Sequence, residues 1–156
     1  MRRILIILSL LIMPLASYAQ PSDLEKVDEK YAGKTGYQSY IYGKRMISMM
    51  QENASSDVKK LLDRIETIRI IAHTGEDIDS LHSEALAAIR KDYELISRMD
   101  EDGSSSLFYL YDTGNKKDNM SFVMINKTAH NCVILEIIGK FDVKDISKLS
   151  LIGQER

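Results

Sequence analysis

The sequence predicts an α+β domain, in which helices pack on a mostly antiparallel sheet of about five strands. Several short runs are rich in isoleucine, tyrosine and other β-branched or aromatic residues, which favours strands. Another stretch repeats apolar residues every three or four positions, which predicts an amphipathic helix. Short connections separate the last three strand segments, so we expect a C-terminal three-strand meander followed by a short helix.

The first half of the chain alternates helical and extended segments. Ser22 is a suitable cap for the first helix, and Gly33 and Gly36 interrupt the helix further on. A tyrosine-rich segment and an isoleucine-rich segment predict the first two strands, because β-branched and aromatic side chains suit a pleated surface. The expected elements are helices over 23–31, 43–51 and 57–62 and strands over 37–41 and 65–72.

The longest predicted helix covers 77–99. Its apolar residues are three or four positions apart and form one stripe, with charged residues on the other side: Ile78, Leu81, Ala85, Ile89, Tyr93 and Ile96. The acidic run from Asp100 to Asp102, followed by Gly103, predicts a solvated helix end. A calcium loop is not indicated there, because the twelve-residue ligand pattern is missing.

Three strands and a helix follow, with the strands expected over 106–111, 120–126 and 132–138 and the helix over 142–149. The first of these strands is apolar on both alternating sets, with Leu107 and Tyr109 on one side and Phe108 and Leu110 on the other. A sheet with one wet face alternates apolar and polar residues. We therefore expect both faces to be covered, either by helices of the same chain or by a second subunit or partner.

The N-terminus has the three parts of a cleavable secretory signal. Arg2 and Arg3 precede an apolar run over 4–15, and Ala19 closes the small-residue segment before Gln20. The run is too short for a spanning helix, which needs about 20 residues. We predict a signal peptide over 1–19 and a single domain over 20–156, exported to the periplasm or secreted, with no membrane anchor after cleavage.

Composition excludes some classes of function. The formal net charge of −2 leaves no excess of lysine and arginine to neutralise phosphates, which argues against nonspecific nucleic-acid binding. Cys132 is the only cysteine, so no intrachain disulfide is possible. An exported domain without disulfides is more typical of a bacterial envelope than of a eukaryotic secreted protein.

The order of several segments resembles a known family. The segments are YQSYIYGKRMISMM, IETIRIIAHTGED, KDYELISRMDEDG, MSFVMI and VILEIIGKFDVKDISKL. Together, from about Tyr31 to Leu149, they are similar to the domain of unknown function (DUF) 4252 family. The resemblance implies an exported protein of Bacteroidetes-type bacteria, where many members are lipoproteins. This chain has Gln20 where the lipidated cysteine of those members stands, and the resemblance supplies no catalytic residues.

The histidines do not have the spacing of a metal site. His73, Glu76, Asp77, Asp79 and His82 would converge only if the start of the 77–99 helix gathered them. The pattern favours a polar turn and helix start instead, with the acidic residues near the positive end of the helix dipole. We expect no metal and no cofactor.

No nucleophile with an activating partner is evident. Cys132 begins a strand that we expect to be buried, and His130 lies across a bend from it. A thiolate nucleophile needs a partner that stabilises it, so a structural cysteine is the better interpretation. The serines over 104–106 lack the G-x-S-x-G elbow and predict a polar linker.

Two further features have alternative interpretations. Glu136 lies between Leu135 and Ile137 in an apolar strand, where an unpaired buried charge is costly. We therefore expect either a basic partner, such as a lysine of a neighbouring strand, or a position at a sheet edge. An inward charge at a sheet edge discourages aggregation. A functional carboxylate is a third interpretation. The other feature is an apolar methionine ridge, which fills the core or binds partners adaptably: Met46, Met49 and Met50.

These observations favour a non-catalytic binding or accessory module of the bacterial envelope. Its expected partner is another protein or a second copy, bound through an apolar sheet face. The alternative function is a small periplasmic hydrolase or metal-dependent enzyme that uses the acids and histidine near 77–82.

Overall fold

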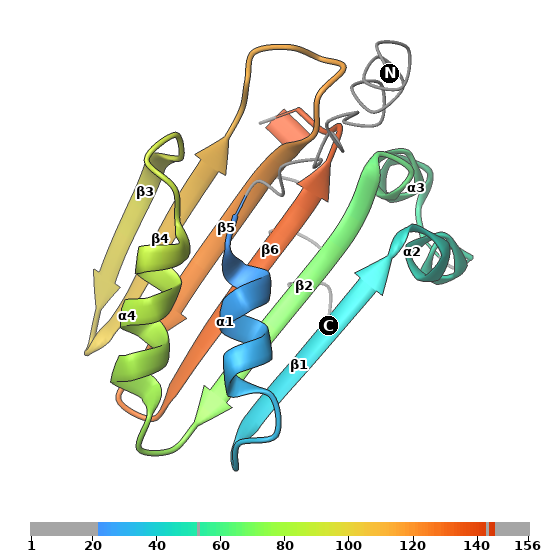
Figure 1. The fold of residues 1–156 in the computed structure, drawn as a ribbon. Helices are drawn as coiled ribbons and strands as arrows, with labels where there is room; N and C mark the ends of the chain where they lie inside the picture. The colour runs from blue at the N-terminus through green and yellow to red at the C-terminus, as the bar shows by residue number, and fades with distance from the viewer. Residues whose placement is uncertain (1–21, 53, 143, 146–156) are drawn as a thin grey trace, which may run out of the picture.

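The computed structural model describes residues 22–52, 54–142 and 144–145, and it has an α+β architecture (Figure 1). The described residues form four helices and a six-stranded sheet, which confirms the predicted fold class. The helices are α1 (Leu24–Tyr31), α2 (Lys44–Met50), α3 (Ser56–Leu62) and α4 (Ile78–Ala88). The strands are β1 (Tyr37–Gly43), β2 (Ile65–Thr74), β3 (Glu94–Glu101), β4 (Ser104–Tyr111), β5 (Met120–Lys127) and β6 (Asn131–Gly139).

Every pair of neighbouring strands is antiparallel, and the spatial order is β1-β2-β6-β5-β4-β3. The predicted C-terminal meander is confirmed as β4, β5 and β6. The long strands β2 and β6 pair in the middle of the sheet, from Ile65 opposite Gly139 to Thr74 opposite Asn131. β1 and β3 are therefore the two edges.

The predicted helix over 77–99 is wrong beyond Ala88, because the chain turns there and returns as strand β3. The hairpin that follows explains the change. Asp102 and Gly103 have φ angles of 44° and 79°, and two consecutive positive φ values at an Asp-Gly pair are typical of a tight β-hairpin turn. The same acidic segment therefore joins two strands and does not end a helix. The serines over 104–106, predicted as a linker, begin β4.

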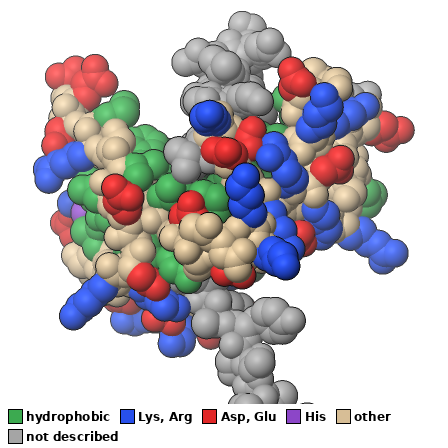
Figure 2. Space-filling view, turned by 90° about the horizontal axis from the view of Figure 1, so that it is seen from above, with side chains coloured by type: hydrophobic (Ala, Val, Ile, Leu, Met, Phe, Trp, Pro, Cys, Tyr) green, Lys and Arg blue, Asp and Glu red, His purple; other side chains and the backbone are tan. Residues whose placement is uncertain are grey.

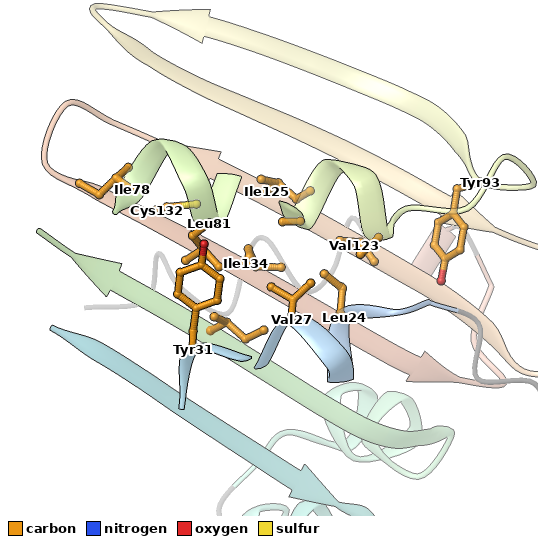
Figure 3. Close-up of a cluster of buried hydrophobic side chains, with 13 residues drawn as sticks. Leu24, Val27, Tyr31, Ile78, Leu81, Tyr93, Val123, Ile125, Cys132 and Ile134 are labelled. Atoms are coloured by element: carbon orange, nitrogen blue, oxygen red, sulfur yellow. The ribbon is translucent and has the colours of Figure 1, made fainter. Parts of the chain in front are cut away.

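Helices α1 and α4 cover the first face of the sheet. Their apolar side chains pack against the inward side chains of the central strands, as Figure 3 shows. Leu24 and Tyr31 of α1, Leu81 of α4 and Val123 and Ile134 of the sheet are almost completely buried. This cluster is the larger part of the core.

Helices α2 and α3 cover part of the second face. Ile47 of α2 and Leu61 of α3 are buried in a second cluster with Ile65, Phe122 and Ile137 of the sheet. Side chains of the central strands are thus apolar on both faces, as the sequence predicts, and helices of the same chain pack on each face. The second face is covered less completely, because several of its apolar side chains are only partly buried.

A close backbone contact fixes the start of β1 against the end of β2. The Thr74 amide donates a hydrogen bond to the Gly36 carbonyl at 3.0 Å. Gly36 has a φ of +79°, and a Cβ atom there would lie 2.0 Å from the Thr74 carbonyl oxygen. Glycine is required at this position because of both the backbone conformation and the lack of space.

Two predicted segments fall largely outside the described residues. These are the signal peptide over 1–19 and the closing helix over 142–149, of which only Lys144 and Asp145 are described as helical. Among the helices of the described part, none is long and apolar enough to cross a membrane.

Candidate functional site: a buried charge network and an exposed hydrophobic surface

A buried ion pair lies at the centre of the first face. Arg69 of β2 and Glu136 of β6 are opposite each other in the strand register. The Arg69 Nη1 atom is 2.6 Å from the Glu136 Oε2 atom, and the two residues are 6% and 1% exposed. Ser22, just before α1, donates its hydroxyl hydrogen bond to the other carboxylate oxygen. The pair is thus hydrogen-bonded on both sides of the carboxylate.

Helix α1 contributes a second carboxylate to this network. Asp28 is buried, and its Oδ2 atom is 4.0 Å from the Arg69 Nε atom. The hydroxyl groups of Tyr37 and Ser39 on β1 both donate hydrogen bonds to the Asp28 carboxylate. We call Ser22, Asp28, Arg69 and Glu136 the buried charge network. It joins α1 and Ser22 to strands β2 and β6, and the hydroxyl groups of Tyr37 and Ser39 attach it to β1.

The network corrects one interpretation of Glu136 and refines another. A basic partner on a neighbouring strand is confirmed, but the partner is Arg69 and not a lysine. The sheet-edge interpretation is wrong, because β6 lies between β2 and β5. Burial raises the pKa of Glu136 from its ordinary value, against the opposing effects of Ser22 and Arg69.

The described surroundings of the network give it a structural role. Glu136 and Arg69 are enclosed by α1 and the sheet, so a substrate has no open path to either group. Both Glu136 oxygens and the Arg69 Nη1 atom are hydrogen-bonded, which makes a buried charge tolerable, whereas the Arg69 Nε atom has no hydrogen-bond partner among the described residues. This arrangement holds α1 in one position on the sheet.

His73 occupies a separate buried position on the same face. Its ring lies 6.2 Å from the Tyr31 ring and 6.3 Å from the Tyr37 ring, between centroids. Neither ring nitrogen has a hydrogen-bond partner among the described residues. Burial also raises the pKa of Tyr31 to about 12. His73 is therefore enclosed by aromatic side chains, away from solvent.

The acids and histidines near the start of α4 are engaged separately. Asp77 lies 3.7 Å from the Lys34 ammonium group, and Asp79 pairs with Lys127. His82 is on α4, where burial lowers its pKa below the ordinary value. Within the described residues, no group of three or more histidine, cysteine or acidic side chains is placed to hold a metal ion.

Cys132 and His130 belong to different environments. Cys132 is completely buried in the first-face cluster, and burial raises the pKa of its thiol to about 11. His130 lies in the exposed turn between β5 and β6, where its backbone amide donates to the Thr128 hydroxyl. The two residues do not form a thiolate–imidazole pair of the kind a cysteine nucleophile uses.

An open hollow of about 320 Å³ lies at one end of the sheet, between the β4–β5 connection and the residues after β6. Its charged lining is balanced, with three basic and three acidic residues: Arg64, Lys116, Lys140, Asp112, Asp118 and Asp142. Figure 2, viewed from above, shows basic and acidic side chains intermixed on that side of the molecule. This mixture favours no ligand of one charge.

The clearest surface feature is hydrophobic. Among the described residues, eight large hydrophobic side chains are exposed, and five of them lie in or between β1 and α2. We call these five the β1–α2 surface: Tyr40, Ile41, Met46, Met49 and Met50. Tyr40 lies on the second face of the sheet, and Ile41 extends the set around the β1 edge to the first face, opposite Arg69. Met49 is 68% exposed, whereas Ile47 is the buried residue of α2. The core-filling interpretation of the three methionines is therefore wrong, because α2 directs only its Ile47 side into the core.

Comparison with known proteins identified one family. A family model described as "Domain of unknown function (DUF4252)" matches residues 31–149, which is most of the chain. No curated protein and no solved structure matched the chain.

The ion pair makes a double-substitution prediction. Arg69→Met leaves Glu136 buried without its counter-charge, and Glu136→Leu leaves Arg69 with only the more distant Asp28 carboxylate, at 4.0 Å. Each single substitution is expected to lower the free energy of unfolding by about 3–5 kcal/mol, whereas the double variant, in which only Asp28 loses its counter-charge, should lose clearly less than the sum of the two. Urea unfolding followed by circular dichroism measures all four proteins. Additive losses in the double variant would contradict the pairing.

The Arg69→Met variant should also respond differently to pH. The folded-state pKa of Glu136 is already raised above 4.5 by burial, and loss of Arg69 raises it further. The folded state then binds the proton more tightly than the unfolded state, so stability falls as pH rises from 4.5 through the folded-state pKa. We expect the stability deficit relative to the parent to shrink on acidification to about pH 4. A deficit that is constant with pH would contradict this.

Thiol labelling tests the environment of Cys132. With a thiol pKa of about 11 and no exposed surface, the side chain stays protonated and enclosed at neutral pH. A thiol-specific reagent is expected to label the folded protein only at the rate of unfolding, and to label the urea-unfolded protein at once. Rapid stoichiometric labelling of the folded protein would show an accessible, reactive thiol instead.

Proposed function

The chain belongs to the DUF4252 family, and we propose that it is an exported, non-catalytic module that binds another protein through the β1–α2 surface. The exposed hydrophobic cluster is the observation that carries this proposal. Single exposed apolar residues are common, but a cluster of large ones on a soluble domain is typical of an interaction site. Burial of such side chains against a partner removes apolar area from water and stabilises the complex.

The composition of the surface supports a protein as the ligand. Three of the five side chains are methionines on one short helix, and methionine adapts its shape to the surface it meets. Tyr40 adds an aromatic ring with a polar end, a residue type enriched in protein interfaces. Ile47, on the opposite side of α2, is buried in the second-face cluster and holds the helix on the sheet, so partner binding need not disturb the core.

Export is part of the proposal and rests on the leader. A cut after Ala19 would remove no residue of the described fold, which begins at Ser22. Ser22 is itself bound to Glu136, so the chain is attached to the core within a few residues of that cut. The matured protein would thus keep all of the buried charge network.

A hydrolase or metal-dependent enzyme has less support. That function would use the acids and histidine near the start of α4, where Asp77 and Asp79 are instead paired with lysines. His73 is enclosed between tyrosine rings. The geometry of the described residues therefore favours binding over catalysis.

Site-specific cross-linking in the native cell tests the proposed function. A photoreactive residue replaces Met49 in one strain and Met99 of β3 in a matched strain, because both methionines are more than half exposed. Illumination is expected to give discrete cross-linked products from position 49 and none of those products from position 99. Mass spectrometry then identifies the attached protein.

Two outcomes would overturn the proposal. Absence of products specific to position 49 would show that the β1–α2 surface has no protein partner. The recovered chain also reports on export, because its N-terminal residue should be Gln20 after cleavage. Intact Met1 on the native protein would contradict the proposed maturation.

A further inference from the structure

The two edges of the sheet differ in how they are protected. β3 carries four charged residues and an irregular register between Leu95 and Ser97, which are the usual features that prevent edge strands from pairing. β1 has the sequence YQSYIYG, which contains no charged residue, and most of the strand is exposed. Its register with β2 is regular along all seven residues. Only the β1 edge is therefore open to a further strand.

The direction of the free backbone groups follows from the antiparallel register. The Thr74 amide donates to the Gly36 carbonyl, so residue 36 directs its backbone groups toward β2. Directions alternate along an antiparallel strand. Tyr40 therefore also directs its backbone groups toward β2, whereas Ser39 and Ile41 direct theirs outward. These outward groups have no strand partner among the described residues.

We infer that the partner of the β1–α2 surface is a second copy of this chain, with β1 pairing antiparallel to β1 of the copy. This inference rests on the proposed function and names its partner. A two-fold axis through Tyr40 places Ser39 opposite Ile41 of the copy, and Ile41 opposite Ser39. Both are outward-directed positions, so each pair forms two backbone hydrogen bonds. The two sheets become one continuous sheet.

The side chains at this axis are compatible with self-pairing. Tyr40 is opposite Ile70 and therefore lies on the second face, beside α2. The axis brings it against Tyr40 of the copy at the closer type of cross-strand pair, where two aromatic rings stabilise each other.

Charge distinguishes this edge from the other one as a site for self-association. Antiparallel pairing of β3 with itself about Arg98 would place the two Arg98 side chains directly opposite each other. Like charges directly opposite each other destabilise a strand pair. β1 has no such conflict, because all its side chains between Tyr37 and Gly43 are neutral. The register of β1 about Tyr40 therefore has no charge conflict, whereas the register of β3 about Arg98 has one.

Analytical ultracentrifugation of the full-length gene product, purified after export, tests the inference. The parent is expected to sediment as a dimer that dissociates on dilution. Tyr40→Lys places two ammonium groups at the axis and should raise the dissociation constant about tenfold or more. The matched control is Met99→Lys in β3. Met99 lies on the same face of the sheet as Tyr40 and is similarly exposed, but it is on the other edge, so this substitution should leave the dimer unchanged.

A second variant acts on the backbone. Ile41→Pro removes only an outward amide, which leaves the β1–β2 hydrogen bonds intact and should weaken the dimer. Ile41→Val keeps the amide and should not. Thermal unfolding confirms that each variant is folded.

The outcomes separate this inference from the proposed function. A parent that stays monomeric, or a dimer equally affected by Tyr40→Lys and Met99→Lys, overturns β1 pairing. If position 49 then cross-links to a different protein, the proposed function stands and only the second copy is excluded. If position 49 gives no specific product, both are wrong.

Discussion

The architecture depends on one constraint: the central strands are apolar on both faces, so both faces of the sheet have to be covered. β2, β6 and β5 contribute side chains to both buried clusters. In the part of the chain that the structure describes, four short helices meet this constraint, two on each face. α1 and α4 bury the first face well, whereas α2 and α3 cover only part of the second. The exposed methionines of α2 and the unpaired edge of β1 both lie beside the part of the second face that α2 and α3 leave uncovered.

The buried charge network has a different role from the apolar clusters. An ion pair inside a protein adds little net stability, because desolvation of both charges opposes their attraction. Its value lies in specifying geometry. Asp28 meets Arg69 only when α1 lies across β1 and β2 in the observed position, and Ser22 reaches Glu136 only when the chain enters α1 at that point. The polar groups therefore select one placement of α1 on an otherwise uniform apolar face.

Much of the fold was predictable from the sequence because its strands carry strong local signals. Five of the six strands and the three-strand meander follow from runs of β-branched and aromatic residues. β3 was missed because Ile89, Tyr93 and Ile96 continue the helical spacing of α4, and local spacing says nothing about strand partners. The informative signal was the Asp102-Gly103 pair, which is typical of a hairpin and which here has the positive φ angles that such a turn requires.

The candidate site was less predictable, since it depends on contacts between distant residues. Glu136 is the single charged residue in an apolar strand, and Arg69 is a charged residue among the isoleucines of β2. Because the two charges are opposite, a buried ion pair between them could have been predicted. Asp28 gives no such signal, because an acidic residue in a helix is ordinarily solvated. The methionines of α2 fit either a core or a surface, and only the placement of Ile47 decides between them.

Methionine oxidation in intact cells tests the central claim most directly, namely that the β1–α2 surface is covered in the native state. In the isolated chain Met49 is 68% exposed and Met99 is 54% exposed, so peroxide would oxidise Met49 at least as fast as Met99. Coverage of the surface predicts the reverse order, with Met49 and Met50 oxidised more slowly than Met99. Oxidation of Met49 at the rate of Met99 or faster, measured by mass spectrometry of the same molecules, would contradict the account.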